Sequence, residues 1–421
     1  MTLSGPTGIV DGFVSTAGRI RCPFLSYASM AANASEHPRR LLRGFVSPEL
    51  CKELEFIHRS CGTVGYRPSV FSTTLPHLAA TNCAHLIIPF LPLRDRLKDT
   101  VEDLFGCEFE LFVEFTGLIS WCKGACIGWH SDDNKPYLRQ RDFAAVCYLN
   151  SHEKDFNGGL FHFKDGEPSS IAPTAGDVVV YTADERNVHS VDEVIDGERL
   201  TLTLWFTRDS AHDEDTKLIN LLSQRLLVEH IEPKPFLPLP ASSCMYWLAQ
   251  EKSGFDVRCA RVSILGYDFC PSEGKCSMDD SPCDPLELLD GRLYLGRGDE
   301  VVDREFVNSL HALQVVQFCV WKAAELATER EVHRAGSTRP TVLKRSNNLE
   351  LLVPCDYKLG EAILGGISRH DPKPSFSWDD LVLGIARWEE YMSELHRKLL
   401  ILVPYWLSNH TLSFVDATEL L

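Results

Sequence analysis

The segment Gly128-Trp129-His130-Ser131-Asp132 lies in a stretch, residues 108–208, that is rich in β-branched and aromatic residues. Short runs of these residues are separated by Gly, Asn, Asp and Pro, which predicts about six strands of a β-sandwich or barrel. Residues i and i+2 share one face of a strand, so His130 and Asp132 can reach the same ion. The same spacing at His212 and His230 falls near or inside helical stretches, where the two side chains point apart.

A third candidate metal ligand, His189, follows Asp132 later in the same strand-rich stretch. Two imidazoles and one carboxylate on one face of an ion leave open positions, which is the arrangement used by non-haem Fe(II) oxygenases. The ordinary alternative for His130 and Asp132 is a hydrogen-bonded surface pair.

Three further side chains are candidates for holding an anionic co-substrate. Arg199 opens the strand-like run 199–206, and a buried guanidinium there can bind a carboxylate through two parallel hydrogen bonds. Thr201 shares that strand face, and Tyr148 offers a phenol from a neighbouring run. If a 2-oxoacid chelates the metal at one end, this set anchors the other end. The alternatives are a surface ion pair for Arg199 and a core position for Tyr148.

The ordered set His130-x-Asp132, His189 and Arg199 resembles the 2-oxoglutarate/Fe(II) dioxygenase superfamily. The surrounding sequence is similar to its prolyl hydroxylase branch, with likeness to prolyl 3-hydroxylases and to the catalytic domain of the prolyl 4-hydroxylase α-subunit. The segments 141–150 and 157–163 resemble the collagen prolyl 3-hydroxylases, and 186–191 is similar to the oxygen-sensing prolyl hydroxylases.

The resemblance implies an α+β fold, in which a double-stranded β-helix, or jelly-roll, is flanked by helices. It also implies that His130, Asp132 and His189 bind Fe(II), and that Arg199 and Tyr148 hold the far carboxylate of 2-oxoglutarate. The expected co-substrates are 2-oxoglutarate and O2, with ascorbate as the reductant that restores the iron.

By resemblance, the expected reaction is hydroxylation of a C–H bond of a prolyl residue in a protein or peptide, with release of succinate. Arg141, Asn187 and Trp205 are candidates for contacting that substrate. Two departures bear on the substrate class: Ala144 stands where many relatives have Thr or Ser, and Trp121 where prolyl 4-hydroxylases often have Tyr. The alternatives are a jelly-roll that acts as a binding module and a dioxygenase of small molecules.

Three parts are expected along the chain. Residues 1–40 read as a loose arm, 41–209 as the catalytic jelly-roll, and 210–421 as a mainly helical region of unknown role. Helices are predicted after Ser47-Pro48 and before Gly106. Beyond residue 209, three apolar stripes at helical spacing are interpreted as core faces: Leu218, Leu222 and Leu226; Phe306, Leu310, Leu313 and Val320; and Leu381, Ile385, Trp388, Met392, Leu395 and Leu399.

Composition limits the remaining possibilities. The 421 residues include 42 Lys and Arg against 59 Asp and Glu, a net charge of −17, which disfavours nucleic acid as a partner. No leader-like segment and no long apolar span is visible, so a cytoplasmic or nuclear protein that does not bind membranes is expected. The spacing of Cys270, Cys276 and Cys283 fits no standard zinc pattern, which favours free thiols, with a disulfide or a metal patch as the alternatives. The oligomeric state stays open.

Overall fold

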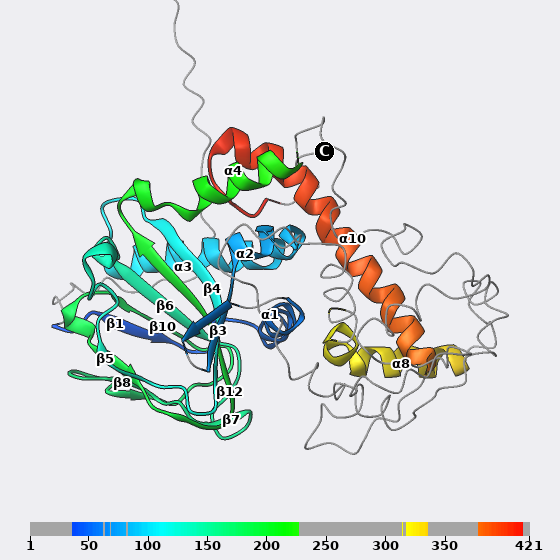
Figure 1. Cartoon of the computed structure of the whole chain (residues 1–421), viewed down its shortest axis with the longest axis horizontal. Helices are drawn as coiled ribbons and strands as arrows, with labels where there is room; N and C mark the ends of the chain where they lie inside the picture. The colour runs from blue at the N-terminus through cyan, green and yellow to red at the C-terminus, as the bar shows by residue number, and fades with distance from the viewer. Residues whose placement is uncertain are drawn as a thin grey trace, which may run out of the picture. The chain divides into compact units, whose positions relative to one another are not determined.

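The computed structural model describes residues 36–226 except 62–63, 68 and 81–82, together with 314, 317–335 and 378–415 (Figure 1). Residues 1–35 of the expected arm lie outside this set. So do the cysteines at 270, 276 and 283 and the stripe residues 306, 310 and 313.

Two antiparallel sheets form the β core of the described chain. The larger sheet has the order β1 (Arg39–Leu42), β10 (Val178–Thr182), β6 (Phe143–Tyr148), β12 (Val194–Thr207), β4 (Phe112–Cys122), β3 (Val70–Thr74) and β2 (Val64–Arg67), and β7 (Phe156–Gly158) also pairs with β12. The smaller sheet has the order β5 (Ile127–His130), β11 (His189–Val191), β8 (Phe161–Phe163) and β9 (Ser170–Ile171). With the helices described below, they confirm the expected α+β jelly-roll.

Successive side chains of β12 point to opposite faces of the sheet, and the two faces pack against different parts of the molecule. Leu200, Leu202 and Leu204 are buried in a cluster that includes the flanking helices. Arg199 and Thr201 occupy the opposite face, and both are buried. The strands β6 and β10 divide in the same way, so the larger sheet has one helix-covered face and one face that packs on the smaller sheet.

The helix boundaries expected at Ser47 and Gly106 are both present. Helix α1 (Pro48–Ser60) begins at Ser47, whose hydroxyl accepts a hydrogen bond from the Leu50 amide. Helix α3 (Leu91–Phe105) ends at Gly106, whose φ of +61° is the left-handed conformation that glycine adopts readily. Together with α2 (Leu75–Ala80) and the 3-10 helix η1 (Ala84–Phe90), they cover one face of the larger sheet (Figure 1).

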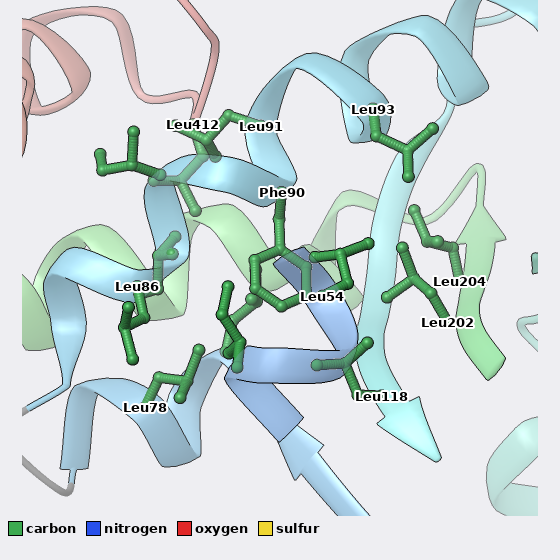
Figure 2. Packing of buried hydrophobic residues seen from close by; sticks show 14 of the residues in the cluster. Leu54, Leu78, Leu86, Phe90, Leu91, Leu93, Leu118, Leu202, Leu204 and Leu412 are labelled. Atoms are coloured by element: carbon green, nitrogen blue, oxygen red, sulfur yellow. The ribbon is translucent and has the colours of Figure 1, made fainter. Parts of the chain in front are cut away.

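Figure 2 shows this packing, with Leu54 of α1 and Phe90 of η1 next to Leu118 and Leu202 of the sheet. Leu412, far away in the sequence, lies in the same cluster.

The described α-helices beyond residue 209 are α4 (Glu214–Leu226), α8 (Ala323–Ala335) and α10 (Trp378–Asn409). Helices α4 and α10 contribute residues to this core, while α8 packs on α10. The predicted stripe residues Trp388 and Met392 are completely buried in this core, and their helix packs on η1 and α4. Leu218, Leu222, Leu395 and Leu399 are buried as well, which confirms these positions of the first and third stripes as core positions. The domain division at 209 stays a prediction. None of the described helices is long and apolar enough to cross a membrane.

A buried ion cluster joins α3, α4 and the larger sheet. An Nη2–Oδ1 distance of 2.7 Å separates Arg94 from Asp215, and Arg94 Nη2 lies 3.3 Å from the carboxylate of Glu214. Its Nε donates to the Thr116 hydroxyl. Asp215 also accepts a hydrogen bond from the Leu412 amide, so the cluster ties the segment after α10 to the sheet.

We predict that Arg94→Met lowers the free energy of unfolding by about 3–5 kcal/mol, because it leaves two buried carboxylates without their cation. The measurement is chemical denaturation followed by circular dichroism. As a control, Lys52→Met removes the exposed Lys52–Glu55 pair on α1 and should change that free energy by less than about 1 kcal/mol. Equal effects of the two substitutions would contradict the role assigned to Arg94.

We also predict that this cluster makes stability depend on pH. Burial raises the pKa of Glu214 to about 7, although Arg94 opposes the shift. The folded state thus binds this proton more tightly than the unfolded chain, so the stabilisation is present at low pH and is lost as the pH rises through about 7. Between about pH 5 and pH 8, the free energy of unfolding should fall more steeply for the wild type than for Glu214→Gln. Parallel profiles would refute this assignment.

Candidate metal and co-substrate site

The three predicted metal ligands lie together at one end of the smaller sheet. His130 is the last residue of β5, and it pairs directly with His189, the first residue of β11. Asp132 lies just beyond the strand, in a turn, rather than on the strand as the sequence pattern predicts. One ligand atom from each of the three residues lies within 4.8 Å of the others. Among the described residues, no other group of His, Cys, Asp or Glu side chains is arranged closely enough to hold a metal ion.

Backbone carbonyls orient both imidazole rings. His130 Nδ1 lies 2.8 Å from the Gly128 carbonyl oxygen, and His189 Nδ1 lies 3.0 Å from that of Asn187. A carbonyl oxygen only accepts, so each Nδ1 carries the proton and each Nε2 keeps its lone pair for a metal. The Phe161 ring stacks on His189, with 4.9 Å between ring centroids and 13° between planes, which fixes that ring further.

Tyr181 is an additional member of this group that the sequence pattern does not single out. It lies on β10, and its hydroxyl donates to Asp132 Oδ2 over 2.9 Å. The only signal in the sequence is a tyrosine within the apolar run Val178-Val179-Val180-Tyr181, which equally describes an ordinary core residue. Which carboxylate it reaches depends on how the two sheets pack.

The predicted co-substrate anchors are brought together on β6 and β12. Tyr148 pairs directly with Thr201, and the guanidinium carbon of Arg199 lies 5.4 Å from the centre of the Tyr148 ring. All three residues are buried. Tyr148 and Tyr181 belong to the same buried cluster, and the Tyr181 hydroxyl donates to Asp132, so Tyr148 lies on the face of the larger sheet that is turned toward Asp132.

Two polar atoms of these anchors are unsatisfied. The Tyr148 hydroxyl and Arg199 Nε are buried and lack a hydrogen-bond partner within the described part of the chain, whereas Thr201 donates to the Ile119 carbonyl over 3.3 Å. Burial raises the pKa of Tyr148 to about 12, so its hydroxyl remains a donor. Buried donors are rarely left unpaired, and these two match the carboxylate of a bound dicarboxylic acid. The residues therefore fit both a metal and a 2-oxoacid.

Close backbone packing accompanies this arrangement at Gly159. Its φ is +63°, and a Cβ atom built there would lie 3.0 Å from Cδ of Arg199. Both the left-handed backbone and the neighbouring arginine favour glycine at this position.

Of the three expected substrate contacts, Arg141 and Trp205 pack on each other. The guanidinium carbon of Arg141 lies 3.4 Å from the centre of the Trp205 ring. Arg141 also donates to Glu114 over 3.1 Å and to the Asp132 carbonyl over 3.3 Å, so it braces the turn that carries Asp132.

The third expected contact, Asn187, is almost completely buried and bound by its own chain. Its amide donates to the Thr182 hydroxyl and to the Pro38 carbonyl, over 2.8 and 3.0 Å, and its oxygen accepts from Arg39 over 3.2 Å. Because its backbone carbonyl also receives His189 Nδ1, this geometry suits a residue that supports His189.

The surface next to Asp132 is polar, and two exposed aromatic residues lie close to Asp132 in the sequence. Trp129 and Tyr137 are 56% and 72% exposed. A pocket of about 430 Å³ is lined by Ser131, Asp133, Asn134, Arg139, Asp184, Glu185 and Arg186. The residues that flank Asp132 on both sides therefore line an opening to solvent.

Solved structures with a similar fold include a Pseudomonas putida prolyl-4-hydroxylase, which is 20% identical and has a TM-score of 0.34. The alignment covers 41% of this chain and 94% of that one. The viral collagen prolyl hydroxylase of Paramecium bursaria Chlorella virus-1 is 16% identical, with a TM-score of 0.33, and 41% of this chain and 97% of that chain are covered.

Curated relatives match a short part of the chain. Over 85 residues it is 33% identical to rat 2-oxoglutarate and iron-dependent oxygenase domain-containing protein 3, covering 20% of this chain and 27% of the relative. Over 83 residues it is 36% identical to chicken prolyl 3-hydroxylase 1, covering 19% and 11%. The chain thus spans less than a third of the length of either relative. Residues 117–207 match the family model of the 2OG-Fe(II) oxygenase superfamily.

Proposed function

We propose that the chain is a 2-oxoglutarate- and Fe(II)-dependent dioxygenase that hydroxylates a prolyl residue in a protein or peptide. The observation that carries the proposal is a pair of complementary groups in one jelly-roll. One is the His130, Asp132 and His189 cluster, whose ligand atoms lie within 4.8 Å of one another. The other is the buried pair of Arg199 and Tyr148, which offers unpaired donors to an anion.

In this proposal, His130 and His189 bind the metal through Nε2, and Asp132 binds it through one carboxylate oxygen. Three protein ligands leave positions open for a co-substrate. Fe(II), 2-oxoglutarate and O2 together supply the oxidative chemistry that converts 2-oxoglutarate to succinate and CO2 and hydroxylates a C–H bond. The chain's own share is to orient the ligands and to keep bulk water out.

Arg199 and Tyr148 bind the distal carboxylate of 2-oxoglutarate, and Thr201 lies next to them as a further hydroxyl. A buried cation is costly unless it is paired, so Arg199 gains its counterion only when the dicarboxylate enters. Its positive charge also offsets the repulsion that an anion meets in a chain of net charge −17.

The likeness to prolyl 3-hydroxylases supports a prolyl residue as the substrate. Trp129 and Tyr137 are exposed and lie close to His130 and Asp132 in the sequence. They suit contact with an extended peptide, because aromatic side chains supply large contact areas at interfaces. Among the sequence candidates, Trp205 keeps its place in this proposal, since its buried Nε1 has no partner among the described residues. We assign Arg141 and Asn187 to supporting roles.

We predict that His130→Ala abolishes both metal binding and turnover. The assay supplies Fe(II), 2-oxoglutarate, ascorbate as the proposed reductant and a library of Pro-containing peptides, and it measures succinate release and hydroxylated peptide. The wild type should produce both, and His130→Ala should produce neither. His162→Ala is the matched control and should keep full activity, because His162 lies on β8 of the same sheet and pairs with Asp192. Full activity of His130→Ala would show that the site is misassigned.

The same assay separates the alternatives. A chain that binds metal but not 2-oxoglutarate would be a binding module. Succinate release with small molecules but with no peptide would place the substrate in another class.

We predict that Arg199→Met raises the KM for 2-oxoglutarate by about ten- to a hundredfold, because it removes charge-assisted hydrogen bonds worth about 1.5–3 kcal/mol. Metal affinity should stay near the wild-type value. Arg43→Met is a suitable control, since Arg43 is exposed and pairs with Asp177 in the same domain. An unchanged KM in Arg199→Met would remove Arg199 from the co-substrate site.

A further inference from the structure

We propose that Tyr181 is a positioning residue of the metal site, which holds one oxygen of Asp132 so that the carboxylate offers a single oxygen to the metal. The inference rests on the proposed function, because it takes Asp132 as a metal ligand. It adds a residue that neither the sequence motif nor the family match assigns.

The hydrogen bond of Tyr181 divides the Asp132 carboxylate into two different oxygens. Oδ2 accepts from the Tyr181 hydroxyl over 2.9 Å. Oδ1 lies 4.0 Å from His189 Nε2 and is the oxygen that faces the imidazole. Tyr181 belongs to β10 of the larger sheet, whereas Asp132 follows β5 of the smaller sheet. The bond therefore links the two sheets at the candidate metal site.

The surroundings of Tyr181 leave its ring little freedom. Tyr181 is buried, and the Phe161 and Phe163 rings contact it with centroid distances of 6.0 and 5.4 Å. On the neighbouring strand β6, Ala144 is its direct cross-strand partner. Side chains of such partners lie on the same face, about 4.5–5.5 Å apart at Cβ, so a small residue at 144 leaves space for the phenol.

A bulkier residue at 144 would compete with the Tyr181 ring for the same space. The alanine and the tyrosine therefore act as a matched pair, in which one makes room for the hydrogen bond that the other forms.

A carboxylate with one oxygen held by a phenol binds a metal through its other oxygen. Chelation through both oxygens would take up a position that the co-substrates need, and a freely rotating carboxylate would lose part of its affinity. Groups that orient metal ligands through hydrogen bonds typically change metal affinity by about ten- to a hundredfold when they are removed.

The test is titration of the metal-free full chain with Co(II), which reports on the site without turnover. We expect Tyr181→Phe to weaken Co(II) binding by about ten- to a hundredfold. At saturation, the visible absorption of its bound Co(II) should differ from that of the wild type, because absorption follows coordination geometry. A merely structural role of Tyr181 would leave this spectrum unchanged.

Tyr391→Phe is the matched control, because it also removes a tyrosine hydroxyl from a carboxylate. Tyr391 on α10 donates to Glu53 Oε1 over 2.7 Å, away from the candidate site. Its Co(II) affinity and spectrum should equal those of the wild type. Thermal unfolding in EDTA checks that each variant folds without metal.

Wild-type affinity and an unchanged spectrum in Tyr181→Phe would overturn the role of Tyr181 and leave the proposed function standing. Wild-type protein that binds no Co(II), or binds it equally well after His130→Ala, would overturn both. If Tyr181→Phe does not fold, Ala144→Val tests the proposal instead, because it keeps the Tyr181 hydroxyl but crowds the Tyr181 ring. Weaker binding in Ala144→Val supports the proposal, and unchanged binding refutes it.

Discussion

The direct pairing of His130 with His189 across β5 and β11 is the constraint on which the candidate site depends. A shift of one residue in this register would turn one imidazole to the other face of the sheet. The neighbouring structure secures the pair: the carbonyls of Gly128 and Asn187 fix the imidazole protons, and Phe161 stacks on His189. Asn187 is itself held by Arg39 of β1, so the larger sheet also supports the smaller one.

One face of strand β12 packs in the hydrophobic core, and the other face carries candidate site residues. Along β12, leucines bury themselves under the helices while Arg199 and Thr201 point toward the interior between the sheets. The pairing of Thr201 with Tyr148 on β6 follows from the same register. Under the proposed function, the register that stabilises the fold also positions the co-substrate anchors, and a bound anion would pair with the buried guanidinium.

Local patterns were sufficient for much of this structure. The limits of α1 and α3 follow from Ser47 and Gly106, and the alternation of apolar residues marks the central strands. Strands β2 and β3, the start of β1 at Arg39 and the role of Tyr181 were not predicted. Each of them depends on partners far away in the sequence: β3 is fixed by pairing with β4, and Tyr181 by its reach from one sheet to the other. Asp132 reaches the cluster from a turn, a detail that strand periodicity cannot describe.

The cover that α10 provides has a consequence for synthesis of the protein. His85 contacts Met392, a residue 307 positions later, and Trp388 is completely buried in the core that contains Leu54. While the chain emerges from the ribosome, the outer surface of α1 and η1 stays without this cover long after the β-strands have been made. The nascent jelly-roll therefore exposes an apolar surface, which chaperones can bind, until α10 has been synthesised and has packed on it.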